Sequence, residues 1–277
     1  MPAKRCQTSN EIQALGRRRG RPVLWVSLVH LPAILILLPV EGLDRVNLME
    51  IEVLADADSV ARKAAALIAA EARQAVAARG RFVLAVSGGR TPWLMLGALA
   101  GEKVPWEELH LVQVDERIAP AESPDRNLTH LRESLLTHVR LQSEQIHAMP
   151  VDAPDLEAAA RSYGRTLHQI FGSPPVLDLV HLGLGPDGHT ASLVPGDAVL
   201  NVTDTDIALT GVYQGRRRMT LTYPMINRSR RILWLVTGSD KAEALTRLRD
   251  ADPSIPAGRV SQNQALVLAD RAAAAQV

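Results

Sequence analysis

The chain has 277 residues, enough for one large domain or two small ones with a substantial core. Its net charge of +1 gives no indication of nucleic-acid binding, and its single cysteine, Cys6, excludes an intrachain disulfide and a cysteine-based metal cluster. One cysteine is typical of the reducing cytoplasm, where we expect the protein to act. Aromatic residues make up only 3% of the chain, so we expect an aliphatic core, as in a sheet covered by helices.

Residues 1–48 differ from the rest of the chain. They carry seven basic and three acidic side chains, and a mostly apolar run covers residues 23–40. This pattern resembles a signal or anchor, but a bilayer span takes about 20 apolar residues, and His30 and Pro32 interrupt the run. We therefore expect an N-terminal extension outside the native fold, such as one translated from a start site upstream of Met49. A membrane anchor and an added packing element are the alternatives.

From Met49 onward, candidate strands and helices alternate. Alternation of this kind predicts a single-domain α/β fold at residues 49–277, with a mostly parallel, doubly wound sheet flanked by helices and no membrane association. The expected strands are residues 51–54, 82–86, 109–114, 177–182, 218–222, 231–236 and 265–268. The first expected helix is capped by Asp56 or Asp58 and runs to about Arg79. The other expected helices are residues 92–100, 127–139, 156–170 and 240–249.

The strand at 82–86 runs into a candidate phosphate loop, residues 87–92, which read Ser-Gly-Gly-Arg-Thr-Pro. Thr91 suits an N-cap and Pro92 the first helical position. A Gly-Gly turn before a helix start is a common phosphate cradle, because free N–H groups and the positive end of the helix dipole meet there. Ser87 and Thr91 would add hydroxyl donors. A plain tight turn is the alternative.

The strand at 109–114 ends in three charged residues, Asp115, Glu116 and Arg117. The carboxyl end of a buried strand is the functional rim of such a sheet. Arg117 can grip a phosphate or polarise a carbonyl, and the two acids can hold that arginine or contact sugar hydroxyls. An ion-pair cluster that fixes a long loop is the alternative. Asn127 either caps the next helix or donates to a ligand.

The strand at 177–182 runs into residues 183–190, Gly-Leu-Gly-Pro-Asp-Gly-His-Thr. Three glycines permit a tight path that presents Asp187 and His189 to a bound molecule. Histidine is the side chain best suited to take a proton near neutral pH, so we expect His189 to be a catalytic base. Asp187 would orient His189 or bind sugar hydroxyls. His181, within the strand, is predicted to be a satisfied core histidine.

A second candidate anion site follows the strand at 231–236. Ser239 or Asp240 would cap the helix there, which places Lys241 in its first turn. A cation at that position opposes the helix dipole at a cost of about 0.3–1 kcal/mol. An anion beside Lys241 would explain the placement, and an exposed lysine offset by Asp240 is the alternative.

The sequence lacks the motifs of several other kinds of active or binding site. The remaining histidines have no HExxH-type spacing, and neither GxSxG nor GxxxxGK[ST] occurs. Residues 183–188 have the spacing of GxGxxG, but no strand with a ribose-binding acid follows about 20 residues later. We therefore expect no metal and no dinucleotide.

Together these segments resemble the 6-phosphogluconolactonase family, within the group that includes glucosamine-6-phosphate deaminase. The resemblance runs from about Met49 to the end of the chain. Its motifs are Ser87-Gly88-Gly89 with Thr91-Pro92; Asp115-Glu116-Arg117 with Asn127; the run from Gly183 to Ser192; Arg218-Met219-Thr220-Leu221-Thr222; and Gly238 with Lys241-Ala242. It implies a Rossmann-like sheet of the deaminase/ribose-5-phosphate isomerase type. It also implies cofactor-free hydrolysis of 6-phosphogluconolactone to 6-phosphogluconate, in the pentose phosphate pathway, by a monomer or a dimer.

On this resemblance the partner is a small phosphorylated sugar lactone. Its phosphate would lie between the loop at 87–91 and Lys241, with Arg117 and Arg218 adding charge. That placement brings the lactone carbonyl near His189. His189 would take a proton from the attacking water and return one to the ring oxygen. Arg117 or loop N–H groups would stabilise the oxyanion.

Two alternatives lie close to this reading. In the deaminase branch the histidine is typically followed by Ile-Ala-Phe-Asn-Glu, whose glutamate assists ring opening. Here Val194 stands at the position of that acid, which argues against deamination. A non-catalytic sugar-phosphate sensor is the second alternative. Such regulators usually carry a helix-turn-helix, and residues 1–48 contain no credible one.

Overall fold

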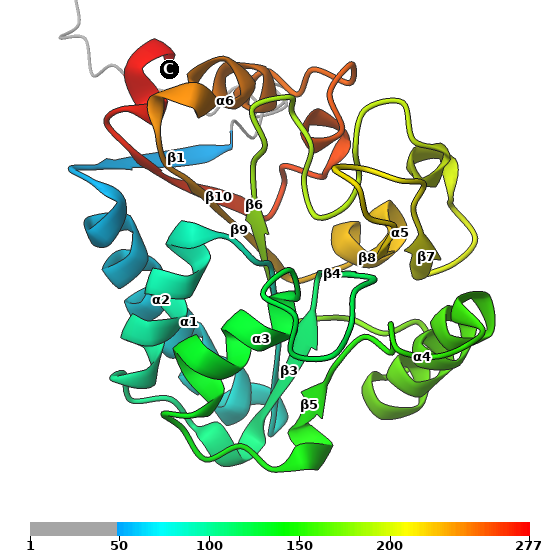
Figure 1. Ribbon diagram of the computed structural model, residues 1–277. Helices are drawn as coiled ribbons and strands as arrows, with labels where there is room; N and C mark the ends of the chain where they lie inside the picture. Colours follow the sequence, from blue (N-terminus) through cyan, green and yellow to red (C-terminus); the bar gives the residue numbers. More distant parts are fainter. Residues whose placement is uncertain (1–48) are drawn as a thin grey trace, which may run out of the picture. The chain divides into compact units, whose positions relative to one another are not determined.

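The computed structural model describes residues 49–277, and the extension predicted at residues 1–48 lies outside them. A seven-stranded sheet, in which all the pairings are parallel, forms the centre of the described part (Figure 1). This confirms the predicted mostly parallel α/β fold. In spatial order its strands are β1 (Glu50–Leu54), β10 (Ala265–Asp270), β9 (Arg231–Val236), β6 (Leu179–Gly183), β2 (Phe82–Val86), β3 (Leu109–Gln113) and β5 (Ile146–His147).

Helices cover both faces of this sheet. They are α1 (Ala57–Arg79), α2 (Arg90–Ala100), α3 (Asn127–Leu131), which a π-helical turn extends over Arg132–Leu136, α4 (Leu156–Phe171), α5 (Tyr223–Asn227) and α6 (Ala242–Arg249). All five residues of β2 are buried, and they alternate between two hydrophobic clusters. One cluster includes α1 and α2, which lie side by side, and the other includes α4, α5 and α6 (Figure 1). The continuous apolar strand at 82–86 is explained by this burial on both faces.

The helix boundaries follow the predicted local signals in part. Asp56 is the N-cap of α1, where its side chain accepts a hydrogen bond from the backbone N–H of Ser59 at 2.8 Å, and Gly80 ends the helix as predicted. No helix in residues 49–277 is long and apolar enough to cross a bilayer.

A second, three-stranded antiparallel sheet is a departure from the predicted elements. It consists of β4 (Asp115–Arg117), β8 (Arg218–Leu221) and β7 (Ile207–Leu209), in the order β4-β8-β7. Asp115–Arg117 were expected only as the charged end of the strand at 109–114 and not as a strand of a second sheet, and β7, β5 and α5, all very short, were not predicted. The change of sheet occurs at Val114, whose N–H donates to Val86 in β2 and whose carbonyl accepts from the N–H of Leu221.

The strand order explains where a site can form. From β2 the chain builds outward through β3 and β5, and it then crosses to β6 and builds through β9 to β10 on the other side. The loops that follow β2 and β6 therefore separate at one point, at the carboxyl ends of two neighbouring strands. A crevice at such a switch point is the usual ligand site of an open α/β sheet.

Candidate active site

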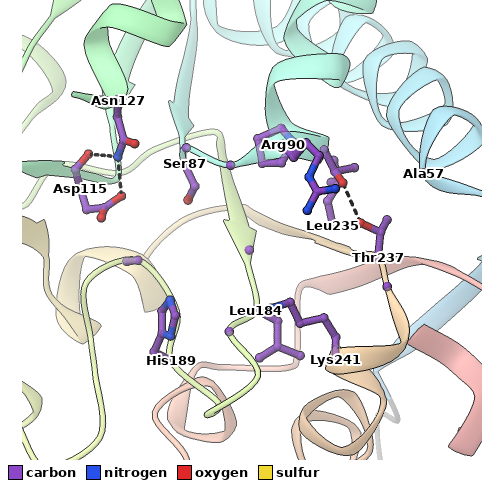
Figure 2. Close-up of a pocket in the computed structure, with 18 of the residues that line it drawn as sticks. Ala57, Ser87, Arg90, Asp115, Asn127, Leu184, His189, Leu235, Thr237 and Lys241 are labelled. Atoms are coloured by element: carbon purple, nitrogen blue, oxygen red, sulfur yellow. Dashed lines mark hydrogen bonds between the residues drawn. The ribbon is translucent and has the colours of Figure 1, made fainter. Parts of the chain in front are cut away.

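A cavity of about 470 Å³ lies at this switch point. Every predicted site residue except Asp187 lines it: Ser87, Gly88, Gly89, Thr91, Asp115, Arg117, Asn127, His189, Arg218 and Lys241. Figure 2 shows His189, Asp115 and Asn127 toward one end of the cavity and Arg90, Thr237 and Lys241 toward the other. The Asp115 carboxylate and the His189 imidazole therefore lie toward one end of the cavity. The cationic side chains of Arg90 and Lys241 lie toward the other end.

The loop after β2 is anchored to the neighbouring strand β6 through His181. The backbone N–H of Ser87 donates to His181 Nδ1 at 3.2 Å, and Ser87 Oγ donates to the His181 carbonyl at 2.9 Å. A Cβ on Gly88 would stand 2.0 Å from Oδ1 of Asn127, so only glycine lets the loop approach Asn127 this closely. Both polar groups of Ser87 thus hold the loop in place.

The start of α2 differs from the predicted start. The N-cap is Gly89 and the first helical residue is Arg90, so Thr91 is not the cap. Thr91 Oγ1 instead hydrogen bonds with Thr237 Oγ1 at 2.7 Å, which joins the loop after β2 to the loop after β9. Glycine has no side chain to satisfy the first N–H groups of α2, and the residues at this end line the cavity. The predicted phosphate loop therefore has the geometry of an anion site.

The second predicted anion site lies at the same end of the cavity as the start of α2. Gly238 precedes a short 3₁₀ turn, Ser239–Lys241, and α6 follows. Lys241 thus lies in the turn that leads into the helix, not in the first turn of α6. Its ammonium is 2.9 Å from Asp240 Oδ2, and Lys241 also lines the cavity, so the lysine both pairs with Asp240 and faces the cavity.

Arg90 is a cavity residue that the sequence analysis missed. It is an exposed cation at the first position of α2, and Figure 2 shows it at the same end as Lys241. The hydrogen bond from Lys241 lowers the pKa of Asp240, and the charges of Lys241 and Arg90 lower it further. The signal for Arg90 in the sequence was a cation directly after the Gly-Gly turn.

Asp115, Asn127 and Arg117 form a connected row along the other side. Asp115 is buried, and its Oδ2 accepts from Ser192 Oγ at 2.5 Å. Asn127 Nδ2 donates to the Asp115 carbonyl and to Oδ1, while Asn127 Oδ1 accepts from Arg117 Nη1 at 2.6 Å. Asn127 is the first residue of α3 and not its cap, since Arg126 holds the N-cap position. Asn127 therefore orients both charged residues toward the cavity.

Glu116 has the structural role that the sequence analysis gave as an alternative. Its side chain is fully buried, and its carboxylate accepts from the backbone N–H groups of Arg117, Asn127 and Leu128 at 2.7 to 2.8 Å. Gln113 Nε2 donates to it at 2.9 Å, and Nε of Arg126 lies 3.4 Å away. Glu116 thus replaces a side-chain cap at the start of α3.

The loop after β6 brings Asp187 and His189 into contact. Asp187 Oδ1 is 2.5 Å from His189 Nδ1, and the His189 carbonyl accepts from the N–H of Gly185 at 2.8 Å. A Cβ on Gly185 would stand 2.1 Å from His189 Nδ1, so this loop requires glycine there. A carboxylate on Nδ1 favours the tautomer with its proton on that nitrogen, which leaves Nε2 for a ligand. Asp187 itself does not line the cavity.

Tyr213 is a second residue that the sequence analysis missed. Its hydroxyl donates to Asp187 Oδ2 at 3.0 Å. Burial raises the pKa of Asp187, but the charge and hydrogen bonds of His189 and the bond from Tyr213 outweigh burial, so the pKa is lowered. No sequence signal pointed to Tyr213, which lies in an irregular stretch before β8.

Arg218 is a buried cation at the cavity wall. Its exposed fraction is 4%, its guanidinium lies 5.0 Å from the centre of the Tyr213 ring, and its Nη2 donates to Gln214 Oε1 at 3.3 Å. Within the described residues, Nε of Arg218 has no hydrogen-bond partner. Burial lowers the pKa of Arg218, and Asp115 raises it in part. A buried donor beside a cavity is suited to bind an anionic or carbonyl oxygen.

His181 is buried as predicted but is only half satisfied. Its Nδ1 accepts from Ser87, while its Nε2 has no partner within residues 49–277. Burial lowers the pKa of His181 to about 3, so the ring is neutral. The same part of the chain contains no group of three His, Cys, Asp or Glu side chains arranged to hold a metal ion.

Comparison with known proteins identifies the family. The family described as glucosamine-6-phosphate isomerases/6-phosphogluconolactonase matches residues 55–268. The chain belongs to this family. The resemblance inferred from the motifs is therefore confirmed, and the matched residues contain all the predicted site residues.

Similar proteins from this family cover nearly the whole described part. A 6-phosphogluconolactonase of Synechocystis sp. is 37% identical over 221 residues, which are 78% of this chain and 92% of that protein. One of Mycobacterium tuberculosis is 37% identical over 241 residues, or 82% of this chain and 98% of that protein. The solved structure of the Thermotoga maritima 6-phosphogluconolactonase has a TM-score of 0.71 at 27% identity and covers 80% of this chain and 98% of its own.

The deaminase branch shares the fold. A solved monomeric glucosamine-6-phosphate deaminase has a TM-score of 0.71 at 21% identity, over 83% of this chain and all of its own. This likeness confirms the predicted Rossmann-like fold of the deaminase type.

Proposed function

We propose that this protein hydrolyses 6-phospho-D-glucono-1,5-lactone to 6-phospho-D-gluconate, as in the second step of the pentose phosphate pathway. The observation that carries the proposal is His189, whose Nε2 is free to face a cavity with Arg90 and Lys241 at its other end. The family and the names of the similar proteins support it. The reaction needs water and no cofactor. The single cysteine supports a cytoplasmic location.

The cationic end of the cavity would bind the 6-phosphate. Gly89 is the N-cap of α2 and has no side chain to bond the first backbone N–H groups of that helix, and Gly238 precedes the turn that carries Lys241. Arg90 and Lys241 add two positive charges, which favour a dianionic group over a neutral one. Binding the phosphate here fixes the distance from it to the lactone carbonyl at the opposite end.

His189 would act as general base and then as general acid. Its Nε2 removes a proton from water as the water oxygen attacks C1, and the carbonyl oxygen becomes an oxyanion. Arg218 and Arg117 supply positive charge near that oxygen. When the C1–O5 bond breaks, His189 returns the proton to the ring oxygen, which becomes a hydroxyl, and the carboxylic acid formed at C1 loses its remaining proton to solvent to give the carboxylate. Asp187 holds His189 in the tautomer that this requires.

The segment that follows His189 favours hydrolysis over ring-opening deamination. Val194, at the position of the deaminase acid, is apolar and 4% exposed. A buried valine cannot move a proton, so this chain has no side chain there to assist ring opening. Lactone hydrolysis needs no such group.

A direct assay tests the function. Fresh lactone is added with and without the protein, and the product is coupled to 6-phosphogluconate dehydrogenase. We expect acceleration above spontaneous hydrolysis, and no ammonia release from glucosamine 6-phosphate. Binding without turnover would support a sensor instead, and ammonia release would support a deaminase.

Residues 49–277 would carry this activity by themselves, because the family match lies wholly within them. A chain that begins at Met49 is then expected to keep the kcat/KM of the full chain. Loss of activity in a folded chain of this length would show that residues 1–48 contribute to the site.

A further inference from the structure

A row of hydrogen bonds extends from His189 beyond Asp187. Asp187 Oδ1 is 2.5 Å from His189 Nδ1, and Asp187 Oδ2 accepts from the Tyr213 hydroxyl at 3.0 Å. Each oxygen of the carboxylate therefore has its own donor, one on each side. The Asp187 side chain is 35% exposed, so without Tyr213 its second oxygen would be free to rotate toward water. The Tyr213 bond removes that freedom.

A tight turn presents the Tyr213 hydroxyl to Asp187. The N–H of Tyr213 donates to the Arg216 carbonyl at 2.9 Å, and the N–H of Arg216 donates to the Tyr213 carbonyl at 3.2 Å. The two residues between them, Gln214 and Gly215, have φ of +49° and +76°. Positive φ at both central positions defines the type I′ turn that matches the twist of a hairpin. The position of the phenol is thus set by a defined backbone geometry.

The turn is also fastened to the loop that follows β4. Arg216 Nη2 lies 2.6 Å from Asp125 Oδ2, and Arg117, the last residue of β4, donates from Nη1 to the Asp125 carbonyl in the same loop. The ion pair is exposed and contributes little to stability. It does limit the directions in which the turn can move.

The aromatic ring of Tyr213 has a separate set of contacts. The Arg218 guanidinium lies 5.0 Å from the ring centre, and Arg218 lines the cavity. A cation over an aromatic face is stabilised by the ring quadrupole. The His189 ring meets the Tyr213 ring edge-on, with 5.4 Å between centroids. The Tyr213 side chain therefore contacts both His189, the proposed base, and Arg218, a cation of the cavity wall.

We propose that Tyr213 is a positioning residue of the lactonase described above: its hydroxyl fixes Asp187, and through Asp187 the tautomer and orientation of His189, while its ring holds Arg218 at the cavity wall. The inference rests on the proposed function. Hydroxyl and ring have separable effects. The hydroxyl acts on proton transfer, and hence on kcat, whereas the ring acts on a cation of the binding cavity, and hence also on KM. Burial and the bond to Asp187 raise the pKa of Tyr213, which keeps the phenol a donor at neutral pH.

Two substitutions at Tyr213 separate these effects. Tyr213→Phe keeps the ring and removes one hydrogen bond to a charged group, so we expect kcat to fall about tenfold with KM within twofold of wild type. Tyr213→Leu also removes the ring, and we expect KM to rise several-fold in addition. Because Tyr213 lies on a half-buried surface turn, both variants are expected to fold.

Tyr163→Phe is the matched control. Its hydroxyl also donates one hydrogen bond, to the His147 carbonyl at 2.7 Å, but Tyr163 lies on α4 and does not line the cavity. We expect wild-type kcat and KM for this variant. A Tyr213→Phe protein with wild-type kcat would overturn the proposal, as would an equal loss in Tyr163→Phe.

A measurement that needs no turnover separates this proposal from the proposed function. The ring ¹⁵N shifts of His189, assigned by their loss in His189→Gln, report which nitrogen carries the proton. We expect them to indicate the Nδ1–H tautomer in wild type, and to move in Tyr213→Phe but not in Tyr163→Phe. Unchanged shifts in Tyr213→Phe would refute the positioning role. A wild-type protein inactive on the lactone would refute the function alone, and moved shifts would still support the role.

Discussion

At His189, the two ring nitrogens have different surroundings. Nδ1 faces Asp187, while Nε2 faces the cavity. A histidine with one nitrogen bound to a carboxylate is held in one orientation, so under the proposed function its loss should affect proton transfer more than binding.

His189→Ala should therefore lower kcat by about 10²- to 10⁴-fold, the usual contribution of a general base. Binding of 6-phosphogluconate, measured by calorimetry, should change little, because the phosphate end is intact. A variant with wild-type turnover above the spontaneous background would remove His189 from the mechanism.

Lys241 tests the opposite end of the cavity. Lys241→Met keeps the length of the side chain and removes the charge, so KM for the phosphorylated lactone should rise about tenfold, with little change for unphosphorylated gluconolactone. Lys63→Met is the control, since Lys63 pairs with Glu52 and does not line the cavity. Equal effects of Lys241→Met on the two lactones would show that Lys241 does not bind the phosphate.

Among the elements, the short strand β4 and the helix α3 depend on one buried acid. Glu116 accepts from three backbone N–H groups at the start of α3 and lies beside Arg126. Those three donors are bonded to a side chain only while the carboxylate is present, whereas Arg126 also pairs with Asp152 at 2.7 Å.

Glu116→Ala should lower the free energy of unfolding by about 3–5 kcal/mol, because it leaves several buried donors unpaired and removes the carboxylate beside the buried Arg126. Urea denaturation followed by circular dichroism measures this loss. Glu107→Ala, at an exposed position, should stay within about 0.5 kcal/mol of wild type. A loss below 1 kcal/mol at Glu116 would mean that water replaces the carboxylate.

Local patterns predicted the long elements well and the short ones poorly. The apolar runs of β2, β9 and β10 and the alanine-rich α1 were found with ends within about two residues. By contrast β4, β5 and β7 have two or three residues each, too few for any periodicity to show. All three residues of β4, Asp115–Arg117, are charged, and two of them line the cavity. Charged residues are not typical of a buried strand, so no separate strand was predicted there.

Over the whole of residues 49–277, buried neutral histidines make stability depend on pH. Burial lowers the pKa of His181 to about 3, and burial together with the charge of His110 lowers that of His147 to about 4, both from an ordinary 6.5. The unfolded chain therefore binds more protons than the folded one below pH 6.5. By linkage, stability is complete above that pH and is lost as the pH falls toward 4.

The free energy of unfolding should therefore decrease between pH 6.5 and 4.5, with a slope of up to about 1.4 kcal/mol per pH unit from His181. His147 adds a smaller slope, since solvent reaches it in part. Urea denaturation at several pH values measures the slope. His181→Asn keeps an acceptor for the Ser87 N–H and does not titrate, so it should flatten the curve. An equally steep curve in this variant would assign the effect to other groups.

The sequence by itself determined the parallel α/β fold, the family and ten of the residues that line the cavity. Glycine turns, helix starts and strand ends are local, and a topological rule places the ends of parallel strands at one edge. Only the tertiary structure decided that Glu116 is buried and structural while its neighbours face the cavity. It also decided that Arg90 joins Lys241, and that Tyr213 reaches Asp187 from 26 residues away in the chain. Such contacts depend on how separate loops pack, and no local pattern of residues encodes that packing.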